Sequence, residues 1–256
     1  MSQRPGEMRA PEKPCHGFDA RVNPYGPTIT PNPRRSIDGN HSGRTFRSRL
    51  QPEDHGADHH RHAARLLLPG GFGEKLGNDT SLLLAAVEPT QRVLARARQR
   101  EMFIIHTREG HRPDLTDCPP AKLTRGGKTF IGTDSPMGRI LVRGEQGHDI
   151  IHQLYPIKGE PIIDKPGKGS FHATDLHQIL LDRGIKTLIV CGVTLEVCVH
   201  TTVREANDRG YECVVLSDCV ASYFPEFQRV GLEMIKAQGA IFGWVSNSDK
   251  FIAAVG

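Results

Sequence analysis

The 256-residue sequence predicts an α/β fold in three layers, a mostly parallel β-sheet with helices on both faces. Short apolar segments alternate with amphipathic segments from residue 161 to the C-terminus, which is the pattern of β–α–β crossovers. The apolar segments are nearly continuous, as expected of parallel strands that are covered on both faces. Hydrophobic residues make up 37% of the chain, which is enough to build one sizeable core.

The expected elements follow in chain order. A helix begins with Asp79 or Thr80 as its N-cap, and Pro89 is expected to kink or split it. A buried strand then covers residues 102–106, and a loop-rich segment with Gly and Pro punctuation covers 108–150. Apolar runs and helical periodicity define the rest: strand 161–164, helix 174–183, strand 187–192, helix 196–208, strand 213–216, helix 226–238 and strand 240–245. In such a sheet the chemistry lies at the carboxyl ends of the strands.

Residues 1–68 differ in composition from the rest of the chain. Up to about residue 60 the sequence is rich in Pro, Gly, Asn, Arg and His and has almost no apolar periodicity. Such a composition is typical of extended or disordered segments. We therefore divide the chain into a disordered or aberrant lead-in, residues 1–68, and a folded domain, residues 69–256.

The composition argues against nucleic-acid and membrane partners. The net charge is +4, the basic residues are scattered, and the Arg-rich segment 34–49 lacks interleaved aromatic residues. No apolar run approaches the roughly 20 residues that cross a bilayer, and the N-terminus has no apolar signal core. The six cysteines include no CxxC pair, which indicates free thiols in a reducing compartment. We expect a cytoplasmic protein.

Cys198 is the strongest candidate for chemistry. It follows the apolar strand 187–192 and falls in the first turn of the next helix. Amide N–H groups and the helix dipole there stabilise a thiolate, and the same N–H groups can receive the oxyanion of a tetrahedral intermediate. A buried structural cysteine is the alternative, which fits Cys191 in mid-strand well. Position alone leaves both roles open for Cys198.

A long motif around this cysteine resembles a known family. Gly192-Val-Thr-Leu-Glu-Val-Cys-Val-His-Thr-Thr-Val-Arg-Glu-Ala-Asn-Asp-Arg-Gly210 is similar to the cysteine motif of the isochorismatase-like hydrolases. Within that superfamily it looks most like the biuret and ureidoacrylate amidohydrolase branch. The resemblance covers roughly residue 70 to the C-terminus. It implies an isochorismatase-like hydrolase domain over residues 69–256, with Cys198 as the nucleophile.

The resemblance also assigns a catalytic lysine. Ile163-Asp-Lys-Pro-Gly-Lys-Gly-Ser-Phe171 matches the family's lysine motif, and Lys165 takes the catalytic position. Its role would be to hold the thiolate and to orient the catalytic carboxylate. Lys168, in the same Gly-rich turn, is expected to be solvated.

The family's backbone features are carried over in the same way. The family has a cis peptide bond, which here is the Val193–Thr194 bond, and it forms its oxyanion hole from the amides that correspond to Thr194 and Cys198. Leu195 departs from the family's usual Thr, which should alter packing rather than mechanism.

Other residues carry weaker implications. Gln238 resembles the position from which biuret hydrolases contact substrate, although an exposed glutamine at a helix end fits nearly as well. The polar stretch 107–114 either lines the pocket or forms a surface loop. His106 and His111 do not reproduce the metal-binding set of nicotinamidases, so we expect no catalytic metal and no cofactor. Relatives form dimers and tetramers, which implies a homodimer or homotetramer.

The family's general base is missing from this sequence. Members begin the fold with an apolar strand that ends in Ile-Asp-Met-Gln-x-Asp-Phe, whose first Asp takes the cysteine proton. Residues 53–68 stand in that place here, and Asp58 is the nearest candidate replacement. The segment also contains four histidines that could instead indicate a metal tract: His55, His59, His60 and His62. We expect the first strand and its Asp to be missing, and the chain as written to be less stable and weakly active or inactive.

A shift of reading frame accounts for this segment. If residues 54–66 are back-translated and read one nucleotide later, permitted codons include Thr-Thr-Ala-Leu-Ile-Ile-Ile-Asp-Met-Gln-Arg-Asp-Phe in order. That string restores both the strand and the base. We hypothesise that part of the lead-in is translated out of frame and that the frame returns near Leu68. The encoding nucleotides test the hypothesis, which fails if no single shift there encodes Ile-Asp-Met-Gln.

These features predict a cysteine-dependent hydrolase of C–N bonds. Its substrate would be a small ureido or amide compound, biuret-like or ureidoacrylate-like, that reacts through a covalent acyl-enzyme. One alternative is a catalytically dead homologue that binds ligands or forms oligomers. Another is an isochorismatase-type vinyl-ether hydrolase, against which Cys198 argues because those enzymes need not use a cysteine.

Overall fold

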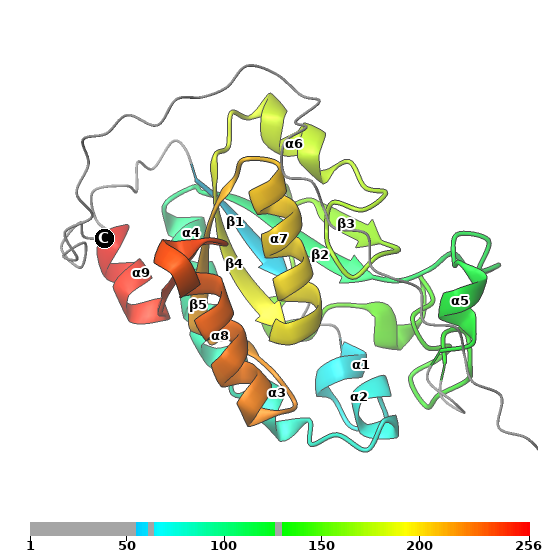
Figure 1. The fold of residues 1–256 in the computed structure, drawn as a ribbon. Coiled ribbons are helices and arrows are strands. Elements are labelled where there is room, and N and C mark those ends of the chain that lie inside the picture. Colours follow the sequence, from blue (N-terminus) through cyan, green and yellow to red (C-terminus); the bar gives the residue numbers. More distant parts are fainter. Residues whose placement is uncertain (1–54, 61–63, 126–129) are drawn as a thin grey trace, which may run out of the picture. The chain divides into compact units, whose positions relative to one another are not determined.

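A six-stranded parallel sheet forms the centre of the computed structural model, which describes residues 55–60, 64–125 and 130–256 (Figure 1). The strands lie in the spatial order β3-β2-β1-β4-β5-β6. Their bounds are β1 His55–His60, β2 Phe103–Glu109, β3 Ile162–Lys165, β4 Thr187–Val193, β5 Glu212–Ala221 and β6 Trp244–Ser246. Every neighbouring pair is parallel, so the carboxyl ends of all six strands lie at one edge. The predicted α/β fold is confirmed.

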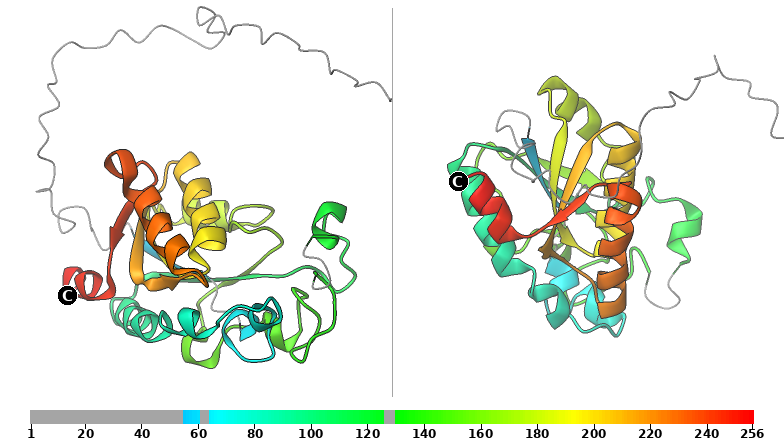
Figure 2. Two further views of the ribbon diagram at one scale, coloured as in Figure 1. Left: turned by 60° about the horizontal axis from the view of Figure 1, so that its bottom comes forward. Right: turned by 60° about the vertical axis from the view of Figure 1, so that its left-hand side comes forward.

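Helices cover both faces of the sheet, as Figure 2 shows with the sheet seen nearly edge-on. One face carries α1 Ala64–Leu67, α3 Ser81–Leu84, α4 Val87–Gln99 and α9 Ser248–Ala254. The other carries α6 Leu176–Asp182, α7 His200–Asp208 and α8 Pro225–Ala240. The remaining short helical segments are α2 Phe72–Lys75, α5 Pro120–Leu123, η3 Gln146–His148, η4 His152–Leu154 and η5 Leu195–Val199. None of the helices in the described ranges is long and apolar enough to reach across a bilayer.

Alternate side chains of β4 enter two separate cores. Ile189 and Cys191 pack with the helices of the first face, whereas Leu188 and Val190 pack with those of the second, and all four are fully buried. This alternation follows from the two-residue repeat of a strand. Cys191 therefore has the structural role that its mid-strand position suggested. It is one of five described cysteines, all free thiols as predicted.

The prediction that the first strand is missing is wrong for the backbone. β1 pairs with β2 on one side and with β4 on the other, with Asp58 opposite both Ile105 and Val190. The ladder uses main-chain N–H and C=O groups, so a segment without an apolar pattern can still occupy the position between two strands. The side chains of residues 55–63 lie outside the described part of the structure. Neither the histidine tract nor a role for Asp58 is therefore tested.

The boundary predicted before residue 69 is also too late. Leu66 and Leu67 of α1 lie in the first core, and Leu67 is fully inaccessible to solvent. Together with β1, these residues belong to the same compact unit as the rest of the described chain. The folded domain therefore begins before Pro69. Of the predicted lead-in, residues 1–54 and 61–63 lie outside the described residues.

Several elements differ in length from the prediction. The first helix is split, as expected, but at Ala85–Ala86, so that Pro89 lies in the first turn of α4. β2 continues three residues past the predicted end, to Glu109, because its polar residues Thr107 and Glu109 are buried. β5 likewise runs on to Ala221. Strand signals taken from apolar runs alone therefore end too early at this edge of the sheet.

Candidate active site

Cys198 lies at the carboxyl edge of the sheet, just past β4. The strand ends at Val193, the Val193–Thr194 peptide bond is cis, and η5 is a single wide helical turn that leads into α7. The cis bond is the one that the family resemblance implied. The Cys198 side chain is almost completely buried. The thiol thus occupies the helical turn in which the sequence placed it.

The amides of this turn converge on one carbonyl. The N–H groups of Val197, Cys198 and Val199 donate to the Thr194 oxygen at 3.3, 3.1 and 3.3 Å. The Cys198 N–H can therefore receive an oxyanion only if it shares or leaves the Thr194 carbonyl. The assignment of Thr194 and Cys198 to an oxyanion hole stays a prediction.

Glu109 is the acidic side chain beside the Cys198 thiol. It ends β2 and is completely buried. Its Oε2 accepts a hydrogen bond from the Cys198 thiol at 4.0 Å, the long end of such contacts, and its Oε1 lies 2.9 Å from Lys168 Nζ. Sequence reasoning did not single out Glu109, because it treated residues 107–114 as pocket lining or surface loop. The available signal was its place three residues past an apolar strand, at the edge where Lys165 was expected.

Lys165 ends β3, directly opposite Glu109 in the strand register. Paired residues of a parallel ladder project from the same face, so the two side chains share one side of the sheet. Lys165 is fully buried, and its ammonium group donates to the carbonyl of Gly167 at 3.2 Å and to that of Lys168. The structure thus brings Cys198, Lys165 and Glu109 to one edge of the sheet.

Lys168 is only partly solvated. Its side chain is 45% exposed, yet its ammonium group is paired with the buried Glu109 carboxylate. Lys168 is therefore exposed, as expected, but the pairing of its ammonium group with Glu109 was not expected. The cause is the extension of β2, which carries Glu109 to the turn between Lys165 and Phe171.

Hydrogen bonds tie the lysine motif to the cysteine motif. The Ser170 N–H donates to Thr202 Oγ1 at 2.9 Å, and the Phe171 N–H donates to Glu205 Oε2 at 3.0 Å. Thr202 and Glu205 lie on α7, which begins two residues after Cys198. The loop that carries both lysines is therefore held against the helix that follows Cys198.

Gly169→Ala is expected to lower turnover roughly 10-fold to 100-fold, because misplacing a reacting group by about 1 Å has an effect of this size. An added Cβ would lie 2.0 Å from Glu205 Oε2, so Glu205 would have to release the Phe171 N–H. Steady-state kinetics of the purified variant measure the effect. Gly167→Ala is the matched control, since the atoms nearest to its Cβ would belong to the exposed His172 side chain, at 3.1 Å. Equal losses in the two variants would contradict this account of the loop.

The structure does not bring Gln238 to this cluster. Gln238 is exposed and lies in the non-helical kink at the end of α8. The nearby Ile241 carbonyl accepts a hydrogen bond from Asn207, at the far end of α7 from Cys198. α7 spans nine residues, about 13 Å. The implied substrate contact of Gln238 is therefore not supported within one chain, because α8 runs from the carboxyl edge to the amino edge of the sheet.

Two buried histidines near these segments have lowered pKa values. For His111 the main cause is burial, followed by the Lys122 ammonium group, whose nitrogen lies 3.3 Å from Nε2. Burial also lowers the pKa of His200 at the start of α7, whose Nε2 lies 2.8 Å from the Gly231 carbonyl oxygen. Both rings are therefore neutral at neutral pH. Among the ionisable groups at this edge, Glu109 contacts the Cys198 thiol and Lys168 pairs with Glu109.

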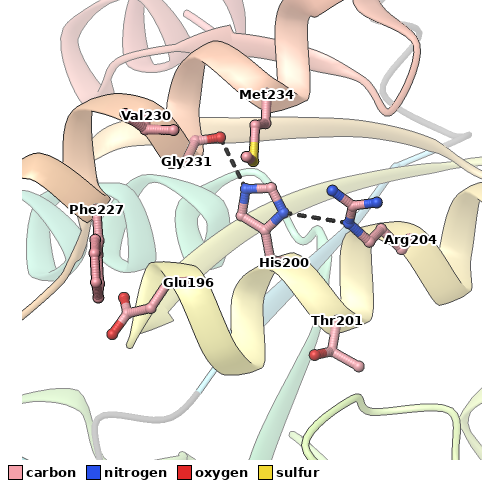
Figure 3. Close-up of a pocket in the computed structure, with 8 residues that line it drawn as sticks. All are labelled: Glu196, His200, Thr201, Arg204, Phe227, Val230, Gly231 and Met234. Carbon is pink, nitrogen blue, oxygen red and sulfur yellow. Dashed lines mark hydrogen bonds between the residues drawn. The ribbon is translucent and has the colours of Figure 1, made fainter. Parts of the chain in front are cut away.

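A surface pocket of about 400 Å³ lies between η5–α7 and α8 (Figure 3). Its walls include Glu196, His200 and Arg204 on one side and Phe227 and Met234 on the other. Cys198 does not line it, so this pocket is separate from the candidate site.

Behind this pocket Leu195 packs tightly against α8. The Leu195 side chain is fully buried, and a Cβ at Gly231 would come within 2.9 Å of it. Glycine at position 231 thus permits the close approach of α8 to the turn that carries Cys198. Leu195 thus has a packing role in this chain, and the effect of its departure from the family's Thr stays a prediction.

Comparison with known proteins agrees with this arrangement. Residues 70–249 match the model of the isochorismatase domain. A cysteine hydrolase from Pseudomonas syringae pv. phaseolicola 1448A is 25% identical, with a TM-score of 0.68 over 80% of this chain and 94% of that one. An isochorismatase family protein from Desulfovibrio vulgaris subsp. vulgaris str. Hildenborough is 22% identical, with a TM-score of 0.64 over 77% of this chain and 95% of that one. N-carbamoylsarcosine amidase from Thermoplasma acidophilum is 19% identical, with a TM-score of 0.60 over 77% and 97%. The match of the domain model over most of the chain shows that this protein belongs to the isochorismatase family, whose members are hydrolases.

Proposed function

We propose that this chain is a cysteine-dependent hydrolase that cleaves a C–N bond in a small ureido or amide compound. The observation that carries the proposal is the buried contact of the Cys198 thiol with the Glu109 carboxylate, at the edge where Lys165 and Lys168 also lie. A thiol becomes a strong nucleophile where a base can take its proton and nearby cations stabilise the thiolate. In this cluster Glu109 provides the base, and Lys165 and Lys168 provide the cations.

The chemistry proceeds in two stages. The Cys198 sulfur attacks the carbonyl carbon of the substrate, and the amides of Thr194 and Cys198 receive the negative oxygen. The C–N bond then breaks, and ammonia or an amine leaves with a proton. Water attacks the acyl-sulfur bond, the acid is released, and the thiol is restored.

Two further observations support this substrate class. The amidase with the same fold acts, by its name, on a carbamoyl compound, N-carbamoylsarcosine. The motif around Cys198 is similar to that of the biuret and ureidoacrylate amidohydrolases. Small planar compounds with alternating carbonyl and amino groups, such as biuret and ureidoacrylate, are therefore the first substrates to test.

Cys198→Ser is expected to reduce ammonia release from biuret or ureidoacrylate to the uncatalysed background. A serine hydroxyl keeps the shape of the side chain but ionises far less readily than a thiol. Cys118→Ser is the matched control, since burial raises the pKa of that thiol and it should react poorly. Circular dichroism of both variants checks the fold.

The remaining outcomes decide between the candidate functions. Undiminished ammonia release by Cys198→Ser contradicts the proposal. Release of pyruvate from isochorismate, without ammonia from any ureide, favours the vinyl-ether hydrolase. A folded chain that binds ureides but turns over none of these compounds is a catalytically dead homologue.

A further inference from the structure

We infer that Glu109 is the proton acceptor of Cys198 in this chain, in the role that an aspartate has in its relatives. This inference rests on the proposed function. Glu109 is in hydrogen-bond contact with the sulfur, through Oε2 at 4.0 Å, and both side chains are at most 1% exposed. A carboxylate at this position touches the reacting atom itself.

The strand register explains how Glu109 comes to this place. Thr107 lies opposite His60, the last residue of β1, so Glu109 is two residues nearer the carboxyl edge than the end of β1. The family's aspartate ends the first strand, whereas Glu109 ends the neighbouring strand, β2. Two adjacent parallel strands finish at the same edge. A glutamate on the second can therefore reach a thiol that an aspartate on the first would also reach.

The two oxygens of Glu109 have different partners. Lys168 binds Oε1 at 2.9 Å, and Oε2 faces the Cys198 sulfur. Burial of an ionised carboxylate is costly unless a cation pairs with it. Lys168 provides that cation, and Lys165 lies directly opposite Glu109 on β3. The pairing keeps Glu109 ionised, so that it can accept a proton, and fixes which oxygen does so.

The proton then follows a closed cycle. Oε2 takes the thiol proton as the sulfur–carbon bond forms, and the protonated Glu109 gives it to the leaving nitrogen as the C–N bond breaks. In the second stage Glu109 takes a proton from the attacking water. It returns that proton to the sulfur as the acyl group leaves. Each stage ends with Glu109 ionised, as general acid–base catalysis requires.

The test compares Glu109→Gln and Glu109→Asp with the parent chain, using biuret and ureidoacrylate as substrates. Glu109→Gln is expected to lower turnover roughly 10²-fold to 10⁴-fold at neutral pH, the usual contribution of a general base. Its residual rate should rise with pH between pH 6 and 8, because without the carboxylate the thiol proton must be taken by hydroxide or buffer. The parent rate should vary little over the same range.

Glu109→Asp keeps the carboxylate but shortens its reach. It is expected to lose about tenfold in rate, since misplacement by about 1 Å is costly, and to keep the pH profile of the parent. Glu160→Gln is the matched control for the loss of a buried carboxylate. The Glu160 side chain is 8% exposed and ion-paired with Arg98, and Glu160 precedes the amino end of β3, whereas Glu109 lies at the carboxyl edge. Its replacement should leave the pH profile unchanged.

The outcomes separate the inference from the proposed function. If Glu109→Gln loses rate equally at every pH, or retains the parent rate, Glu109 is not the base, although Cys198 can still be the nucleophile. If Cys198→Ser is as active as the parent, the proposed function itself fails. A pH-dependent residual rate in Glu109→Gln, with the parent profile in Glu109→Asp, supports the inference even if both variants are less stable.

Discussion

An apolar first strand is expected to stabilise this protein by at least about 3 kcal/mol, relative to the present His55–His60 segment. The variant carries Ala57→Leu, Asp58→Ile, His59→Ile and His60→Ile. A central strand of a parallel sheet is covered on both faces, and fully burying one large apolar side chain contributes about 1.5–3 kcal/mol. The residues opposite β1 on its neighbours, among them Ile104, Ile105 and Val190, are already buried.

Urea unfolding at equilibrium measures this gain in the free energy of unfolding. A second variant with Thr at the same four positions is the control, because Thr shares the high β-propensity of Ile but buries less apolar surface. The free energy of unfolding of the apolar variant should exceed that of the Thr variant by most of the expected gain. The pairing of β1 between β2 and β4 indicates that both faces of this strand are covered. Equal free energies of unfolding for the two variants would contradict that.

Lys165→Met is expected to lower turnover about 10³-fold or more. Lys165 is fully buried, and its ammonium group holds the carbonyls of Gly167 and Lys168. Methionine has a similar length but no charge and no hydrogen-bond donor. The variant therefore loses the cation opposite Glu109 and loosens the turn that carries Lys168. We propose that these groups act on the reacting atoms, so the loss should appear mainly in kcat.

Lys168→Met provides the comparison. Its side chain is 45% exposed, so water can partly replace the ammonium group that it offers to Glu109. We expect a loss of about tenfold for this variant, well below that of Lys165→Met. A Lys165→Met enzyme with the kinetics of the parent would remove Lys165 from the catalytic machinery.

The cysteine and lysine of the site could be predicted because each belongs to a contiguous motif. Cys198 follows an apolar strand at a fixed distance, and Lys165 ends a strand in a recognisable Gly-rich segment. The contact of Glu109 with Cys198 joins residues 89 positions apart. It also depends on β2 continuing through polar residues, which an apolar pattern does not reveal.

β1 was mispredicted, and the implied substrate contact of Gln238 is not supported within one chain, for different reasons. The β1 segment has no apolar pattern, and only its pairing with β2 and β4 makes it a strand. Gln238 was placed by similarity of a short segment alone. The crossover from β5 through α8 to β6, which the sequence did predict, already puts the end of α8 at the amino edge. The order of the elements along the chain therefore predicted the position of Gln238 better than sequence similarity did.

Trapping the acyl-enzyme tests the central claim, that Cys198 is the nucleophile, most directly. The parent chain is mixed with biuret, quenched in acid, digested and analysed by mass spectrometry. We predict that the peptide containing Cys198 carries the acyl remainder of the substrate on its sulfur, and that Cys198→Ser shows no adduct and releases no ammonia. Ammonia release by both proteins, with the Cys198 peptide unmodified, would contradict it.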